Sequence, residues 1–215
     1  MPNHVKNKIK APKDVIEAIT NDSGQVDFSL VLPSFNDGLE GGISGNAESL
    51  AESCVPFKES GNSMLDRMKV GNMLGSDIKS LSDEQFCDFI TMIKNYRDHG
   101  YFHCMDFNRE EWGTKWNAYN CDIKGETASF ETAWSHPYPV IKKLSEMFPD
   151  VEIEVKYADE DFGNNLGSYS IKNGEKVFIN KIENPDEFAI KLHCGDSAKP
   201  EDFERDENWQ YIEDC

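Results

Sequence analysis

The chain is short of basic residues. Its 215 residues include 22 Lys and Arg against 40 Asp and Glu, so its formal net charge is −18. A field of this sign repels phosphate backbones and attracts basic surfaces, which opposes general binding to nucleic acids. The acidity serves either solubility alone or the recognition of a basic partner, and composition leaves both interpretations open.

Long apolar runs and paired cysteines are also missing. No apolar run reaches the roughly 18 residues that a membrane-spanning helix needs. The opening segment MPNHVKNKIK lacks the apolar core of a secretory signal. We therefore expect a cytoplasmic protein without membrane contacts. The cysteines, which form no C-x-x-C pair and are more typical of a reducing cytosol than of a disulfide scaffold, are Cys54, Cys87, Cys104, Cys121, Cys194 and Cys215.

The motifs of several enzyme classes do not occur. There is no G-x-x-x-x-G-K-[ST] phosphate loop and no G-x-G-x-x-G after a predicted strand. Ser44 lies among glycines in GGISGN, but without the G-x-S-x-G spacing of a nucleophile elbow. We predict no catalytic residue, no cofactor and no enzymatic activity.

Two short stretches repeat one pattern of metal-ligand residues, His103-Cys104-x-Asp106 and His193-Cys194-x-Asp196. Two His and two Cys would satisfy tetrahedral zinc. Adjacent residues on a strand point to opposite faces, however, so each pair would need a loop to converge on one ion. Two unrelated cysteines are the simpler explanation, and no metal site is predicted.

Apolar periodicity predicts the elements of the first half. Residues 4–10 alternate as a strand with one basic face, and residues 12–22 follow as a helix. Residues 26–32 alternate again and are predicted to form a second strand, which ends at Pro33. Helical spacing is clear over 82–99, begun by a capping box and stopped by a glycine. The residues predicted to share the apolar face of that helix are Phe86, Phe89, Ile90 and Ile93.

Strands return in the second half. A hairpin is expected around Lys124-Gly125, with Tyr119, Cys121 and Ile123 on one face of its first strand. An amphipathic helix over 139–149 and a strand over 151–157 follow. Further elements are a hairpin around Asn173-Gly174 and a short helix over 185–193.

The order of these elements predicts an α+β fold. Without the segment 34–100 and the last hairpin, the order is similar to β-α-β-β-α-β, the split βαβ plan of ferredoxin-like antiparallel sheets. Helices would cover one face of the sheet and leave the other available. The expected organisation is a ferredoxin-like domain over 1–33 and 101–180, a mostly helical insertion over 34–100, and an acidic C-terminal tail with one short helix over 181–215.

At this point the chain resembles a known family, the YubB-type ferredoxin-like proteins of phages and plasmids. The resemblance rests on MPNHVKNKIK, WGTKWNAYN, FETAWSHPYPVIKKLSEMFP and VEIEVKYADEDFGNNLGSYSIKNGE, taken together and in order. It covers roughly residues 1–33 and 105–180 and implies the topology without an iron–sulfur cluster. It also implies a mobile-element protein that acts on host machinery in the bacterial cytosol. No established catalytic residues carry over.

We therefore predict a protein that binds and modulates a host protein, possessing an acidic surface that fits a basic, nucleic-acid-handling partner. A counter-defence inhibitor of the anti-CRISPR or anti-restriction type matches this description. Charge complementarity of this kind mainly raises the association rate and the selectivity. The predicted contact residues are Glu152, Glu154, Asp159, Glu160, Asp161, Glu201, Asp202, Glu204, Asp206 and Glu207.

The alternative function is direct binding of nucleic acid on the open face of the sheet, because ferredoxin-like sheets stack bases on exposed aromatic rings. No RNP-like run is present, and the net charge opposes this function. The segment EEWGTKWNAYNCDI supplies candidate side chains that are either structural anchors or contacts on the sheet face. They are Trp112, Lys115, Trp116 and Tyr119.

Overall fold

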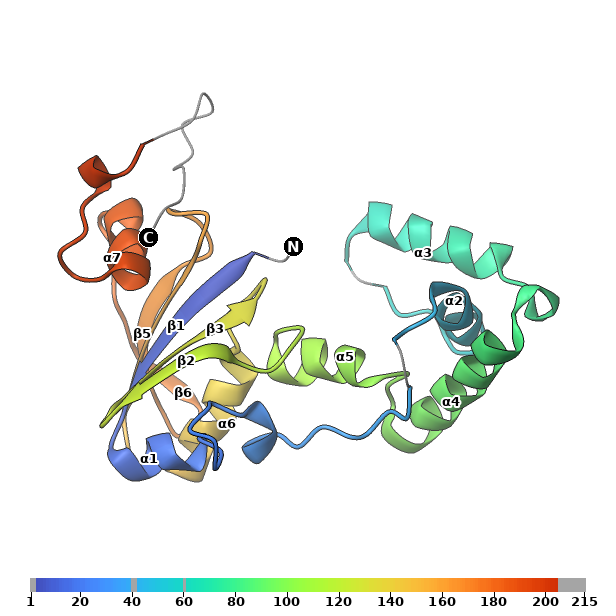
Figure 1. The fold of residues 1–215 in the computed structure, drawn as a ribbon, viewed down its shortest axis with the longest axis horizontal. Coiled ribbons are helices and arrows are strands. Elements are labelled where there is room, and N and C mark those ends of the chain that lie inside the picture. Colours follow the sequence, from blue (N-terminus) through green and yellow to red (C-terminus); the bar gives the residue numbers. More distant parts are fainter. Residues whose placement is uncertain (1–2, 40–41, 60, 205–215) are drawn as a thin grey trace. The chain divides into compact units, whose positions relative to one another are not determined.

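A computed structural model describes residues 3–39, 42–59 and 61–204. The chain divides into two compact units, which are treated separately below (Figure 1). The sheet unit comprises residues 1–34 and 108–215, and the helical unit comprises residues 35–107. Within the described ranges, no helix is long and apolar enough to cross a membrane.

The sheet unit contains one six-stranded sheet in which every neighbouring pair is antiparallel. Its spatial order is β2-β3-β1-β4-β5-β6. With helices α1 (Lys13–Ala18) and α6 (Tyr138–Met147), the first four strands follow the β-α-β-β-α-β order of a ferredoxin-like domain, which confirms the predicted fold class. The strands are β1 (His4–Lys10), β2 (Tyr119–Lys124), β3 (Thr127–Ala133), β4 (Ile153–Asp159), β5 (Gly167–Lys172) and β6 (Glu175–Ile179).

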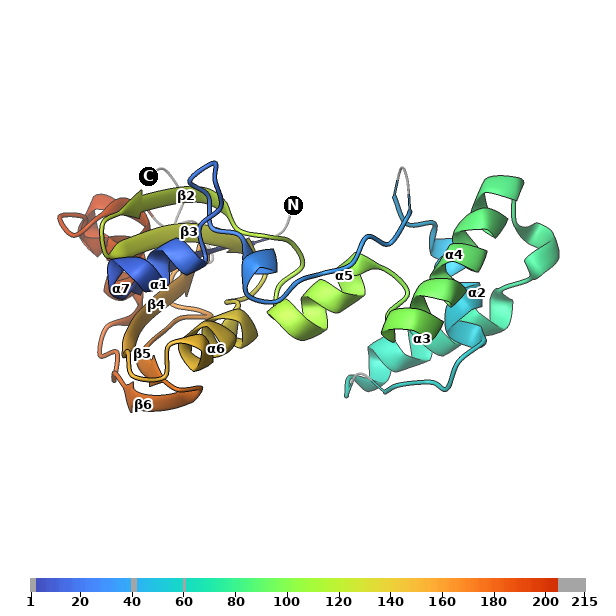
Figure 2. The ribbon, with the colours of Figure 1, turned by 90° about the horizontal axis from the view of Figure 1, so that it is seen from below.

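Alternation along β1 separates the two faces of this sheet. Val5, Asn7 and Ile9 are fully buried on the face that carries α1 and α6 (Figures 1 and 2). Lys6 and Lys8 point the other way, because successive side chains of a strand alternate between faces. The β5–β6 hairpin turns at Asn173-Gly174, both of which have positive φ, as predicted for this pair.

The second face of the sheet is partly covered. Helix α7 (Pro185–Cys194) packs on it, and its Ala189 and Ile190 form a buried cluster with Ala158 of β4 and with Phe162. Ala158 lies on this face because it pairs with Lys6. Its strand neighbour Asp159 pairs with Val5 on the opposite face. The prediction of an open face therefore holds only beyond α7. A 3-10 turn, η4 (Pro200–Asp202), follows α7.

The predicted strand over 26–32 is wrong. Only Val26 makes a single bridge, to Thr20, and Phe28–Leu30 form a 3-10 turn, η1. Side chains occupy the backbone N–H groups that a strand would use for its ladder. The carboxylate of Asp27 accepts the N–H of Ser29, and the side-chain oxygen of Asn117 accepts the N–H of Phe28 at 2.9 Å. The second strand of the ferredoxin-like plan is consequently β2, and the helical unit lies in the connection between α1 and β2.

The predicted faces of β2 also need correction. A bulge falls between Tyr119 and Asp122, where Asn120 has a φ of 48°. Because a bulge adds one residue to one strand, Tyr119 pairs with Glu131 on the face opposite α1 and α6, whereas Ile123 pairs with Ala128 on the buried face. Tyr119 and Ile123 therefore lie on opposite faces.

The helical unit is built around α4 (Asp83–His99). Ser82 and Gln85 form the predicted capping box, and Gly100 ends the helix in the left-handed conformation. The buried face carries Phe89 and Met92, but Phe86 and Ile90, predicted on the same face, are exposed. The other helical elements are α2 (Gly45–Ser53), α3 (Ser63–Gly75), η2 (Ile78–Ser80) and α5 (Cys104–Phe107); the sheet unit resumes with the π-helical turn η3 (Asn108–Trp112).

Candidate functional site

Trp112 anchors the return of the chain into the sheet unit. Its ring is 4% exposed and packs edge-on against Phe28, at 5.7 Å between ring centroids. Its indole N–H donates to the carbonyl oxygen of Leu32 at 2.8 Å. The indole is therefore satisfied in the core, and Trp112 presents no surface to a ligand.

Gly113, the next residue, makes a turn that no other residue fits easily. Its φ is +76°, and a Cβ at this position would lie 2.8 Å from Cδ of Pro139. Its carbonyl oxygen accepts a short hydrogen bond from the hydroxyl of Ser135. The glycine is thus required both by the backbone conformation and by the close approach of α6.

The other candidates in this segment are more accessible. Trp116 is 39% exposed, and the ammonium group of Lys115 lies 4.8 Å from its ring centroid. Tyr119 lies on the sheet face away from α1 and α6, where its hydroxyl is 2.7 Å from Nδ1 of His4. Burial and the charge of Glu131 raise the pKa of Tyr119 to about 12, so it remains a neutral phenol.

Of the predicted acidic contacts, Asp159 is turned inward. It is 4% exposed, and its carboxylate accepts hydrogen bonds from the side-chain amides of Asn3 and Asn165 and from the backbone of Asp161. These hydrogen bonds connect the end of β4 to Asn3 and to the loop that follows β4. The half-buried Asp161 accepts from Asn164, and the N–H of the half-buried Glu160 continues the ladder to His4.

The remaining predicted acids do not form one site in the described structure. Glu152 and Glu154 are exposed next to and within β4, and Glu154 pairs with Lys10 at 3.5 Å. Glu201, Asp202 and Glu204 are exposed at and after η4, where Asp202 accepts the N–H of Lys199. Asp206 and Glu207 lie outside the described residues.

The face opposite α1 and α6 carries both lysines and acids on its central strands, and Glu131 and Glu154 pair there with Lys6 and Lys10. Lys8 of β1 stands directly across from Lys156 of β4 in the ladder. Both side chains are exposed, and neither has an ion-pair partner among the residues described. Like charges directly opposite one another destabilise a sheet, so this pair is a local electrostatic cost that an anion would relieve.

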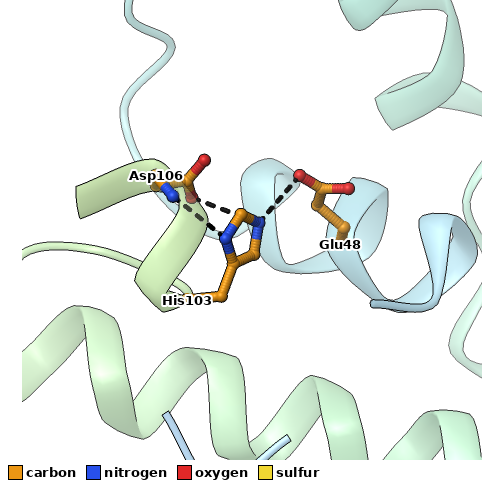
Figure 3. A group of neighbouring side chains, drawn as sticks. All are labelled: Glu48, His103 and Asp106. Carbon is orange, nitrogen blue, oxygen red and sulfur yellow. Dashed lines mark hydrogen bonds and ion pairs between the residues drawn. The ribbon is translucent and has the colours of Figure 1, made fainter. Parts of the chain in front are cut away.

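A second group of polar residues lies within the helical unit, where His103 meets Glu48 of α2 and Asp106 of α5 (Figure 3). Nε2 of the fully buried imidazole lies 3.2 Å from a Glu48 oxygen and 3.4 Å from an Asp106 oxygen. These are residue types and separations that a metal ion would accept. The sequence pattern already contained His103 and Asp106 as candidate ligands. Glu48 is remote in sequence and joins them only in the folded chain.

The other ring nitrogen argues against a metal ion at this position. Nδ1 of His103 accepts the backbone N–H of Asp106 at 3.1 Å, as Figure 3 shows. A neutral imidazole whose Nδ1 is an acceptor carries its proton on Nε2, and a protonated nitrogen cannot coordinate a metal. Metal-bound histidines instead donate from the second nitrogen. The group is therefore a hydrogen-bonded clamp between α2 and α5.

The other cysteine and histidine residues of the two repeated stretches make contacts of a different kind. The Cys104 thiol lies beside Asp37, and burial together with that carboxylate raises its pKa to about 11, which disfavours the thiolate. His193 lies in the sheet unit, where its Nε2 is 3.0 Å from the carbonyl oxygen of Ala158. Cys194 ends α7 in the sheet unit and packs against the buried cluster of Ala158, Phe162, Ala189 and Ile190.

Helix α3 is a feature that the sequence analysis did not single out. None of its thirteen residues is buried, and it contributes no member to the apolar core of the helical unit, which comes from α2, α4 and Phe102. Met64 is 71% exposed, Met68 58% and Leu74 83%. An open hollow of about 620 Å³ lies between α2 and α3. The weak apolar periodicity of residues 63–75 was the available signal.

Two comparisons with known proteins found a similarity, and the family match among them lies within the sheet unit. Residues 112–207 match the family model described as the ferredoxin-like domain in Api92-like protein. A crystal structure of the protein Api92 from Yersinia pseudotuberculosis aligns with 85% of this chain and 98% of that chain, at 10% sequence identity and a TM-score of 0.38. No curated protein matches the sequence.

The family match begins at Trp112, the residue that anchors the sheet unit. Its description as a ferredoxin-like domain agrees with the strand order of the sheet. The predicted relationship to YubB-type proteins, and the phage or plasmid setting that came with it, receive no support from these comparisons.

Proposed function

We propose that the protein acts by binding another protein of basic charge, and that the helical unit provides the contact. The exposed apolar side chains of α3 are the observation that carries this proposal. Methionine and leucine side chains that no part of their own unit covers are typical of surfaces that bind a partner. Methionine suits such a surface because its flexible side chain adapts to different partners.

The charge of the chain supports a basic partner. A net charge of −18 favours encounter with a basic protein and opposes encounter with another acidic one. Acidic residues follow α3 in the helical unit, where Asp83 and Glu84 occupy the first turn of α4. A host protein that handles nucleic acid, and a counter-defence role, remain the more specific hypothesis for this partner.

Comparative affinity capture tests the proposal. The full chain and a Met64→Ser/Met68→Ser variant are used as baits in parallel, at low and high salt. Proteins bound through α3 are retained by the wild type at low salt and lost both with the variant and at high salt. The matched control is Val177→Ser/Ile179→Ser, which removes exposed apolar side chains from β6 instead. Equal recovery with both variants would contradict the proposal.

A second candidate function follows from Lys8 and Lys156. Their unrelieved repulsion favours a phosphate-bearing ligand on the sheet face beyond α7, which is the nucleic-acid alternative predicted above. The central strands supply lysines for contacts with phosphate groups. However, β1, β3 and β4 carry no exposed aromatic ring on which a base could stack. Fluorescence anisotropy with labelled single-stranded DNA and RNA distinguishes the candidates, because Lys8→Gln and Lys156→Gln would weaken only this mode.

A further inference from the structure

We infer that the hollow between α2 and α3 is a docking groove for a basic, amphipathic helix of a partner protein. This inference rests on the proposed function and specifies both the place and the chemistry of the contact. It starts from one side of α3, where residues at spacings of four, three and four lie in line along the helix. They are Met64, Met68, Gly71 and Gly75.

Gly71 has no structural reason to be glycine. It lies inside α3, its φ is not positive, and a Cβ added to it would meet nothing within 4 Å. Glycine inside a helix lowers stability relative to alanine. Gly75, at the end of α3, also has open space around its missing side chain. Both glycines line the hollow, so the space they leave is available to something outside the unit.

The size of the side chains sets how closely two helices approach, and small residues permit the closest packing. At the glycine end of this line a partner helix can come close to the α3 backbone. At the other end, beyond the lining of the hollow, the exposed side chains of Met64 and Met68 supply apolar surface that adapts in shape. The apolar side of an amphipathic helix fits this sequence of contacts.

The charges in the hollow select a basic helix. Glu48 and Glu52 of α2 line it together with Asp77, the N-cap of η2, against the single ammonium group of Lys69. Lys69 is already paired with Glu52 at 2.9 Å, and that hydrogen bond raises its pKa. A Lys or Arg side chain that enters the hollow would therefore meet a net negative lining. Asn46 and Asn72 supply additional oxygen acceptors.

The test uses a fluorescein-labelled peptide of about 18 residues, long enough to form a helix, with leucines in line on one side and lysines elsewhere. Two control peptides carry glutamate in place of lysine, or a central proline that breaks the helix. Binding to the full chain is followed by fluorescence anisotropy at physiological salt. We expect binding of the first peptide only.

The decisive variant is Gly71→Ala/Gly75→Ala, which places two methyl groups where the partner helix would approach the α3 backbone. Neither methyl group would contact another part of the chain. Alanine favours the helix, so the variant should melt at a higher temperature than the wild type while its Kd for the peptide rises at least tenfold. Val70→Ala, on another side of α3, is the matched control and should leave the Kd unchanged. Asp77→Asn, which keeps the η2 cap, should weaken binding several-fold.

Two results would overturn the inference. If Met64→Ser/Met68→Ser abolishes peptide binding and Gly71→Ala/Gly75→Ala does not, α3 is a contact surface without helix docking, and only the proposed function survives. If the basic helical peptide binds no better than its proline control and comparative capture also recovers no α3-dependent protein, both the inference and the proposed function are wrong.

Discussion

Nε2 of His136 and the hydroxyl oxygen of Tyr169 lie 2.7 Å apart beneath the sheet. On the other side of the ring, Nδ1 lies 2.7 Å from the amide oxygen of Asn7. The Asn7 oxygen can only accept, so Nδ1 donates and Nε2 accepts from Tyr169. The neutral imidazole is therefore fully satisfied. Burial, reinforced by the charge of Lys176, lowers the pKa of His136 to about 3.

This pKa predicts that the protein loses stability in mild acid. Between pH 6.5 and 3 the unfolded chain binds a proton at His136 that the folded chain does not, so the free energy of unfolding falls as pH falls. The loss attributable to His136 is about 2 kcal/mol at pH 5. Urea unfolding of the wild type and of His136→Gln at pH 7 and pH 5 measures it. The variant should lose about 2 kcal/mol less than the wild type, and equal losses would contradict the prediction.

Replacement of Gly113 by alanine should destabilise the sheet unit strongly. The new methyl group would meet Pro139 in addition to occupying a left-handed conformation. We expect a cost of about 3 kcal/mol or more, from the conformation and the overpacking together. Gly24→Ala is the matched control: its φ is +73° but its surroundings are empty, so it should cost only about 1 to 2 kcal/mol. Similar costs for the two variants would show that Pro139 yields.

Removal of one lysine from the Lys8–Lys156 pair should stabilise the free protein. Lys156→Gln ends the repulsion across the β1–β4 ladder, and we expect a gain of about 0.5 kcal/mol at low salt. The gain should vanish near 1 M salt, where charges are screened beyond about 3 Å. Lys6→Gln, which instead breaks the 3.2 Å pair with Glu131, should not stabilise. A loss of stability in Lys156→Gln would refute the electrostatic account.

The hydrogen bond from Asp106 to His103 predicts one tautomer in solution. Long-range ¹H–¹⁵N correlation spectra should show a proton on Nε2 and none on Nδ1 of His103. Added zinc should leave these signals in place, because the protonated nitrogen is the one that faces Glu48 and Asp106. A proton on Nδ1, or stoichiometric zinc binding that shifts the His103 signals, would restore the metal interpretation.

The fold class was predictable because local signals agreed with the global plan over most elements. The capping box at Ser82 and the Asn173-Gly174 turn are decided by nearby residues. The strand expected over 26–32 failed for a non-local reason: Asn117, remote in sequence, accepts the Phe28 N–H that a ladder would have used. The bulge at Asn120 likewise reversed a face that strict alternation had assigned to Tyr119.

The candidate surfaces were less predictable than the fold. Asp159 was expected to face a partner, and its carboxylate is instead held by Asn3 and Asn165, a contact that depends on tertiary structure. Exposure of α3 had only a faint signal in the sequence: its methionine and leucine residues are spread around the helix and form no clear apolar side that the unit would bury. Acidic composition predicts a basic charge for a partner but not the place of contact.

The position of the helical unit in the chain has a consequence for folding. β1 is synthesised first, yet its ladder partners are β3 and β4, so that Val5 pairs with Thr132 and Asp159. Among the residues that the structure describes, the core of the helical unit draws only on residues 35–107, so we expect it to form before β3 and β4 are available to pair with β1. If this unit is compact early, fewer flexible residues separate β1 from β3, and we expect the entropic cost of pairing the two strands to be lower. The insertion lengthens the chain between β1 and β3, but its early folding is expected to offset much of the effect of that length on their pairing.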